Sequence, residues 1–383
     1  NTSVGSASGA NITSGASNTS VGYNSLNANL TSSQCTAIGS QALALNTAAE
    51  NTAVGANSLD ANTSGTPNSA FGYNSLTSNV DGASNTAIGK SALQNNTSAS
   101  HNTAVGNNCQ LTNTEGFSNT AVGSLALDAN ATGDNNTAVG RSCLSALNNI
   151  DEITAVGSLC LDALTTGTGN TAMGYGAGGT LTSQNNCTLI GHACGDGLTN
   201  PENTAVGANA LSGSANEGNT AVGMKAAYNL QGQGNTVMGR QAMGVGTHTA
   251  NFSSAYGYNS LEDSTSGNND AFGASSLTSC TSSTGNASFA RGSLQNLVDG
   301  TGYNSAFGHE SINAMTGGGY GSALGYESLH DVTSGSENTG IGYRAGHKIT
   351  TGATNTMLGS QAGGGLTTGG ENIVIGRAAC SNS

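Results

Sequence analysis

Tryptophan is absent from the 383-residue chain, proline occurs only twice, and charged residues make up just 8% of it. The charged share is about a third of that in an average globular protein. The 8 Lys and Arg stand against 21 Asp and Glu and form no basic stripe, so the electrostatic footprint of nucleic-acid binding is missing. No stretch of about 18 apolar residues exists, which predicts no transmembrane helix and no membrane insertion by this segment.

Glycine, by contrast, is abundant, with 59 residues, and apolar residues still make up 35% of the chain. The apolar residues recur with a fixed period, which a disordered chain does not show. The stretch Asn51–Leu59 reads Asn-Thr-Ala-Val-Gly-Ala-Asn-Ser-Leu and returns seventeen residues later as Asn68–Leu76. With Asn51 as position one of its copy, 23 copies begin at residues 1, 18, 35, 51, 68, 85, 102, 119, 136, 153, 170, 187, 203, 219, 235, 253, 269, 286, 304, 321, 338, 355 and 372.

Four columns of this repeat are nearly constant. Position four is apolar or aromatic in every copy, position five is Gly except at Ala290, position eight is small, and position nine is usually Leu. We expect positions four and nine to fill the interior and positions five and eight to permit close approach. The predicted structural core is represented by Val54, Gly55, Ser58, Leu59, Val105, Val122, Val139, Leu144, Leu161, Ile341, Leu358 and Ile375.

Position nine provides an internal check on this interpretation. Six copies carry Gly or Ala there, and each of the six has an aliphatic residue three positions later. An interior space that every copy must fill explains the exchange. The pairs are Gly9 with Ile12, Gly178 with Leu181, Gly195 with Leu198, Ala227 with Leu230, Gly346 with Ile349, and Gly363 with Leu366.

The segments between these columns are rich in Ser, Thr, Gly and Asn, which is typical of turns. Two turn segments in seventeen residues leave no run long enough for a helix. The pattern predicts an all-β parallel β-roll or β-solenoid of about 23 coils, with 17 residues, two short strands and two turns in each coil. Coils would stack about 4.8 Å apart, so that identical Asn, Thr and Val residues form ladders. We expect one repeat domain over residues 1–383, as a fragment of a longer fibre.

Alternation along the first strand places Thr and Val on one face, and Ala and Gly on the other. One face fills the interior of the coil. The other suits the approach of another chain, because strands that are apolar on both faces are usually covered on both. We therefore expect an oligomer, with a monomeric solenoid as the alternative.

Repeated Asn-Thr-Ala-Val-Gly followed by a small residue resembles the head repeats of trimeric autotransporter adhesins, and is similar to repeats in phage tail fibres. The copies Gly342–Gly346 and Gly359–Gly369 resemble the fibre type in particular. The resemblance covers the whole chain. It implies a left-handed β-roll, three identical chains side by side, and display on a cell or virion surface. The period of seventeen is longer than that of the adhesins, and no neck, stalk or membrane anchor is recognisable.

Reactive residues follow the repeat and are not gathered in motifs. Cys143 and Cys160 occupy the small position eight, where a free thiol packs as a small hydrophobe. They lie in adjacent copies and could also approach disulfide distance. No Cys or His spacing is typical of zinc, the six His form no column, and acids such as Asp151 and Glu262 fall in turns. Gly174–Gly179 lacks the Lys and the helix of a phosphate-binding loop. We expect no catalytic, cofactor-binding or metal-binding residues.

These observations indicate a structural or adhesive extracellular fibre segment, a rigid and non-catalytic rod for surface display or attachment. Its expected partners are copies of itself, as a homotrimer or an end-to-end filament, and a cell-surface glycan or receptor that contacts the variable turns. Tyrosines that follow the motif Gly, such as Tyr73 and Tyr326, either cover that glycine or contact glycans. The alternatives are a subunit of an extracellular filament or sheath, an ice-binding solenoid with a Thr ladder, and a β-helix enzyme acting on polysaccharide. The Thr ladder shares its face with Val. If that face fills the interior, the Thr side chains point inward and are not open to ice.

Overall fold

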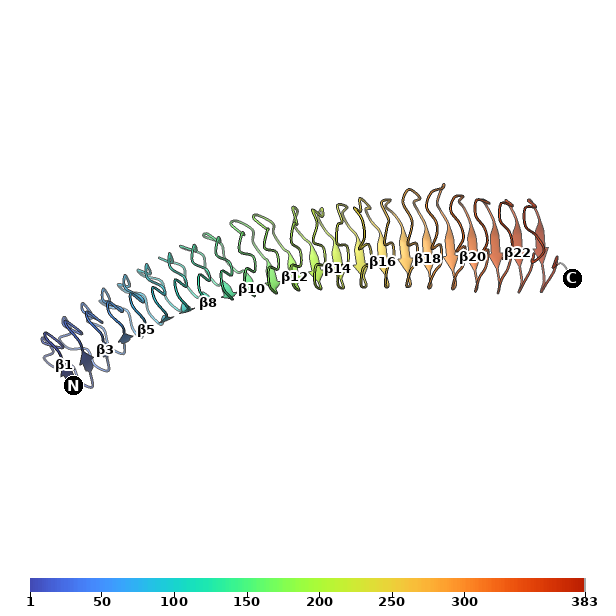
Figure 1. Ribbon diagram of the computed structural model, residues 1–383. Helices are drawn as coiled ribbons and strands as arrows, with labels where there is room; N and C mark the ends of the chain where they lie inside the picture. The colour runs from blue at the N-terminus through green and yellow to red at the C-terminus, as the bar shows by residue number, and fades with distance from the viewer. Residues whose placement is uncertain (382–383) are drawn as a thin grey trace. The chain divides into compact units, whose positions relative to one another are not determined.

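The computed structural model describes residues 1–381 as an all-β parallel solenoid of about 22–23 turns with 17 residues per turn. Each coil contributes one strand of three residues (Figure 1), and no helix occurs among the described residues, so none could cross a membrane. The strands are Thr2–Val4 (β1), Thr19–Val21 (β2), Thr36–Ile38 (β3), Thr52–Val54 (β4), Ser69–Phe71 (β5), Thr86–Ile88 (β6), Thr103–Val105 (β7), Thr120–Val122 (β8), Thr137–Val139 (β9), Thr154–Val156 (β10), Thr171–Met173 (β11), Thr188–Ile190 (β12), Thr204–Val206 (β13), Thr220–Val222 (β14), Thr236–Met238 (β15), Ser254–Tyr256 (β16), Asp270–Phe272 (β17), Ala287–Phe289 (β18), Ser305–Phe307 (β19), Ser322–Leu324 (β20), Thr339–Ile341 (β21), Thr356–Leu358 (β22) and Ile373–Ile375 (β23).

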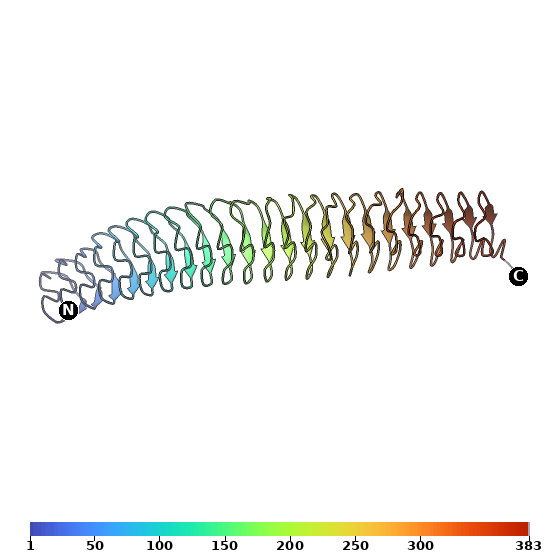
Figure 2. The same ribbon diagram turned by 45° about the horizontal axis from the view of Figure 1, so that its top comes forward.

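The coils group into two compact units, which we call unit 1 (Asn1–Leu189) and unit 2 (from Ile190 onward). Within each unit, successive strands lie side by side (Figure 2) and pair in parallel with identical register positions opposite one another. Thr86, Thr103 and Thr120, for example, form a continuous column in unit 1. The expected solenoid of seventeen-residue coils is confirmed. A single domain over the whole chain remains a prediction.

The prediction of a second strand in each coil is wrong, because each coil has only one strand. The segment that contains Ser58 and Leu59 forms a turn, because Asn57 and Leu59 have left-handed φ angles of 54° and 52°. Alternate residues in this conformation cannot continue a strand. Their N–H groups instead bond to neighbouring coils on opposite sides, with Asn57 N donating to Ser40 O at 2.9 Å and Leu59 N to Ser75 O at 2.9 Å. A left-handed residue other than Gly costs about 1–2 kcal/mol, and burial of the Leu side chain offsets that cost.

The interior is filled by the middle residue of each strand together with positions eight, nine and twelve. Ser58, Leu59, Leu144 and Leu161 are completely buried, as predicted. In the six coils with Gly or Ala at position nine, the aliphatic residue of position twelve fills the interior instead. Leu181, Leu198, Leu230 and Ile349 are buried, and Ile12 and Leu366 are half-buried. A Cβ on Gly363 would lie 2.5 Å from Sδ of buried Met357, so these positions share one volume.

Position four is not part of this interior, and that prediction is wrong. The strand alternation turns Ala of position three inward, which directs Thr of position two and the apolar residue of position four outward. The space opposite Leu of position nine admits only a small side chain, since a Cβ on Gly340 would meet Leu329 Cγ at 2.8 Å. The residues misplaced for this reason are the half-buried Val54, Val105 and Val139 and the exposed Val122, Ile341, Leu358 and Ile375.

Glycine at position five is required by contacts between coils. Gly55 has a φ of 136°, and a Cβ there would lie 2.4 Å from the carbonyl oxygen of Gly72 in the next coil. The predicted close approach is therefore a backbone contact within the chain. Ala290 is the exception to the glycine column and has a φ of 116°.

Two ladders of buried asparagine join the coils of unit 1. At position one, Asn85 Oδ1 accepts from the backbone N–H of Asn102 at 3.0 Å, and Asn85 Nδ2 donates to Ala99 O at 2.8 Å. At position twelve, Asn79 Nδ2 donates to Asn62 Oδ1 at 2.8 Å. Buried polar groups must find partners within the protein, and here each coil supplies them to the next.

Replacement of Asn85 by Ala should destabilise its coil more than the same change at exposed Asn107. The change leaves the N–H of Asn102 without its acceptor, at a cost of about 1–3 kcal/mol, whereas the carbonyl of Ala99 keeps a second donor, Asn96 Nδ2, at 3.0 Å. Guanidinium unfolding, together with hydrogen exchange at the Asn102 amide, would measure the loss. Equal stability of the two variants would show that the ladder is not a major source of stability.

Candidate functional surfaces

The first candidate surface is the strand face, which we define as the outward first and third residues of the strands. In unit 1 it consists mainly of alternating Thr and aliphatic columns, such as Thr103 and Thr120 beside Val105 and Val122. The side chains of the third residues are half-buried or exposed in every coil, with Ile88 at 42% and Val122 at 36%. Each unit therefore presents an ordered, partly apolar surface that its own chain does not cover.

In unit 2 this face becomes aromatic over four consecutive strands, β16 to β19. The rings of Tyr256, Phe272, Phe289 and Phe307 stack with centroid distances of 4.6, 4.7 and 4.6 Å and interplanar angles of 4–7°. Beyond Phe307, an apolar groove continues along Leu324 and Ile341. The stacked rings cover one another's faces, so the ladder offers mainly ring edges to a partner.

The second candidate surface is the post-glycine edge, which we define as positions six and seven of the coils. Of the 8 Lys and Arg residues, all but Lys348 lie there, namely Lys90, Arg141, Lys225, Arg240, Arg291, Arg344 and Arg377. Six tyrosines also directly follow the motif glycine, and they are 44–60% exposed. The basic residues form no run in the sequence, but the coils bring them to the same edge.

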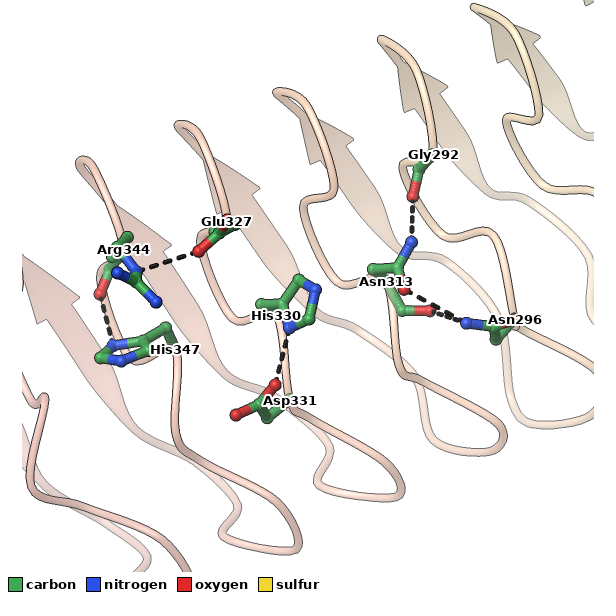
Figure 3. A network of polar contacts seen from close by, with 8 residues as sticks. All are labelled: Gly292, Asn296, Asn313, Glu327, His330, Asp331, Arg344 and His347. Atoms are coloured by element: carbon green, nitrogen blue, oxygen red, sulfur yellow. Dashed lines mark hydrogen bonds and ion pairs between the residues drawn. The ribbon is translucent and has the colours of Figure 1, made fainter.

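Polar contacts order this edge and the turn beside it in the coils of β20 and β21 (Figure 3). Arg344 Nε lies 2.9 Å from Glu327 Oε2 of the preceding coil. His330 Nδ1 lies 2.6 Å from Asp331 Oδ1, and His347 Nδ1 lies 3.2 Å from the carbonyl oxygen of Arg344. Partial burial and the positive charge of Arg344 lower the pKa of His347, so this imidazole is biased toward the neutral form.

Position ten adjoins the same edge. Asn313 Nδ2 donates to Gly292 O at 2.7 Å, and Asn296 Nδ2 donates to the carbonyl and the amide oxygen of Asn313 at 2.9 and 3.2 Å (Figure 3). His309, Tyr326 and Tyr343 stack in consecutive coils at 5.4 and 5.5 Å between ring centroids. Glu327 raises the pKa of Tyr326, because its carboxylate accepts a hydrogen bond from the Tyr326 hydroxyl. The edge therefore combines cations, carboxylates, amides and phenols.

The cysteines are all free thiols, and all but Cys380 are buried. Cys143 and Cys160 form no disulfide and interact as thiols, and this contact together with burial raises the pKa of Cys143. Burial raises the pKa of Cys109 and of Cys194 to about 12. Their thiols donate to the carbonyls of Ala121 and Ala205 at 3.2 and 3.1 Å. These contacts agree with the interpretation of position eight as a packing site.

The other reactive residues remain dispersed. Residues 1–381 contain no group of three His, Cys, Asp or Glu side chains placed to hold a metal ion. Asp151 and Glu152 line an open pocket together with Asn149 and Thr168, and Gly174–Gly179 lies in the turn that follows β11. Comparison of the chain with protein-family models and with curated proteins finds no match. The function must therefore be argued from the two surfaces.

The post-glycine edge does not stand out in the contiguous sequence, although the sequence contains its signal. Basic residues that are seventeen or more positions apart do not form a run, but they share a column when the repeat is aligned. The outward direction of position four, by contrast, can be predicted only once it is known that Ala of position three faces inward. An alignment of copies by charge as well as by hydrophobicity would have found the edge.

The buried thiols predict how stability depends on pH. Unfolded Cys titrates near 9.0, whereas folded Cys109 and Cys194 titrate near 12. The raised folded pKa adds stability that is present below pH 9 and is lost as the pH rises toward 12. The free energy of unfolding should therefore fall between about pH 8 and about pH 11. The fall should be less steep in the C109A/C194A variant, because the two titrating thiols are gone. Ala already occupies this position in other coils, so we expect the variant to fold. An unchanged slope would contradict the assigned burial.

Proposed function

We propose that the chain is a segment of a structural or adhesive extracellular fibre, in which identical chains join through their strand faces. Its role in this proposal is mechanical, as a rigid rod that displays or attaches at a cell or virion surface. The observation that carries the proposal is the outward apolar column at position four in both units.

This column favours a second copy of the same chain as the occupant. The apolar residues recur once per coil, with strand residues in register along each unit. A partner that covers them must therefore present apolar side chains at the same axial repeat, about 4.8 Å. Another copy meets that condition in every coil. The resemblance to trimeric adhesin heads favours three chains.

The aromatic ladder favours one register between the copies. The third strand residue is aromatic from Tyr256 to Phe307, whereas Met238 precedes the ladder and Leu324 follows it. Parallel copies in register would bring ladders of equal size together. A shift by several coils would set rings against smaller aliphatic residues and leave gaps, which lose packing energy.

The substitution V122D tests the joined strand face, with V80D as a matched control. Val122 is 36% exposed on the strand face of unit 1, and Val80 is 43% exposed in a turn of the same unit. In a trimer, V122D places three unpaired carboxylates at one level of the interface, and each costs several kcal/mol. We expect an SDS-resistant trimer in the wild type and in V80D, and dissociation at lower temperature in V122D. Native mass spectrometry gives the number of chains, and a monomeric wild type would overturn the proposal.

Ice binding is the second candidate, favoured by the outward direction of Thr at position two. On β6 to β10 the strand face presents one Thr and one aliphatic residue per coil in strict register. Thr120 is exposed beside Val122, so the ladder does not point inward. A regular array of hydroxyl and methyl groups is open to ordered water only if no second chain covers it.

The substitution T120Y distinguishes this candidate. If the bare strand face binds ice, T120Y should abolish thermal hysteresis, whereas T166Y at an exposed turn threonine of the same unit should retain it. Absence of thermal hysteresis in the wild type would eliminate ice binding. A monomer with strong thermal hysteresis would favour it over the fibre.

A further inference from the structure

The distribution of charge in unit 2 separates the post-glycine edge from the other turns. The chain carries a net charge of −13, yet Lys225, Arg240, Arg291, Arg344 and Arg377 all lie on this edge. Among the carboxylates of unit 2, only Glu310 and Glu327 lie at positions six and seven, and Asp196 and Glu262 lie at the adjoining position ten. The others occupy the strand β17 and the remaining turns. An acidic chain thus presents a local cationic edge, which favours a ligand that carries negative charge.

Aromatic rings hold two of these cations in place. The guanidinium of Arg240 lies 5.6 Å from the ring centroid of Tyr258 in the next coil, and Lys225 Nζ lies 5.6 Å from the ring centroid of Tyr228. Cation–π contact fixes the direction of a long side chain while its N–H donors stay open to solvent. Arg291 is exposed in the coil before the stacked ring of His309. These cations are positioned for contacts outside the chain.

The stacked rings determine how a ligand could lie. Tyr326 and Tyr343 are 5.5 Å apart with an interplanar angle of 11°. Insertion of a sugar or base between two rings needs about 7 Å, twice a normal carbon contact distance. The ligand must therefore run along the ring edges, where it meets the phenol hydroxyls. That geometry fits an elongated chain parallel to the stack of coils.

From these observations we infer that the post-glycine edge of unit 2 binds a linear polysaccharide with carboxylate groups, a polyuronate. Sugar hydroxyls both donate and accept hydrogen bonds, which matches an edge that includes Glu310, Glu327 and Asn313 beside its cations. The sugar carboxylates pair with Lys and Arg. This inference deepens the proposed function, on which it rests for its setting, by naming the ligand class of an attachment fibre.

The arrangement of the cations argues against duplex DNA. Duplex DNA carries one charge per about 1.7 Å of its axis, so its binding proteins need closely spaced cations. Arg240 and Arg291 follow β15 and β18, and two coils without a cation at these positions lie between them. Glu310 and Glu327 repel any anionic ligand, so the ligand must place uncharged groups opposite them. A polyuronate spaces its carboxylates by whole sugar units and separates them with hydroxyls.

The test measures binding of fluorescent polygalacturonate by the whole chain, with EDTA present to prevent bridging by calcium. R291Q removes a cation from the edge, and K348Q removes the exposed cation that lies outside it, so the two variants have the same net charge. We expect R291Q to weaken binding about fivefold and the triple variant K225Q/R240Q/R291Q about fiftyfold, against less than about twofold for K348Q. Uncharged dextran and poly(dT) serve as competing ligands and should bind more weakly.

Three results would overturn the inference: no binding by the wild type, equal losses in R291Q and K348Q, or tighter binding of poly(dT) than of polygalacturonate. Sedimentation of the same samples keeps this test separate from the fibre proposal. A trimer that does not bind polygalacturonate refutes the edge as a polyuronate site only. A monomer that binds it through Arg291 refutes the joined strand face only.

Discussion

Hydrogen bonding between adjacent coils is the constraint on which this structure depends. A coil of seventeen residues is too thin to satisfy its buried polar groups by itself. The amide of Asn85 accepts from one neighbour at the backbone of Asn102 and donates to the backbone of Ala99, while its own N–H donates to Asn68 at 2.9 Å. Because each coil completes its neighbours, stability in such an array is approximately a sum of coil and interface contributions. The Asn and Gly columns follow from this requirement.

The same requirement leaves little room for an interior, and this has consequences for the outer surface. Leu of position nine occupies the space between the strand and the opposite turn, so position three must be small in most coils, as at Ala53. The larger residue of position four is then directed outward by the strand alternation. An apolar face without a cover within its own chain is thus a result of a narrow coil, and it supports the proposal that identical chains cover one another.

Much of this architecture could be predicted from the repeat, and the errors have physical causes. The period, the Leu59 column and the exchange of Gly178 with Leu181 were readable, because each reports one filled volume per coil. The turn that replaces the expected second strand was not, since the left-handed φ angle at Leu59 is unusual for that residue type and the sequence does not signal it. The direction of Val54 was missed because hydrophobicity alone does not distinguish an interior from a covered exterior. The edge cations were visible in the sequence but required counting by column.

The two surfaces have different roles in the proposed fibre, and their combination matters for binding. If strand faces join identical chains, the interface uses positions two and four, whereas the post-glycine edge uses positions six and seven. A trimer would then carry three copies of the edge at the same height. Each edge has few cations and would hold a polyuronate weakly, but linked sites raise the effective concentration for the second and third contacts. Assembly through an apolar face would therefore convert a sparse cationic edge into a multivalent attachment surface, without any coil being chemically special.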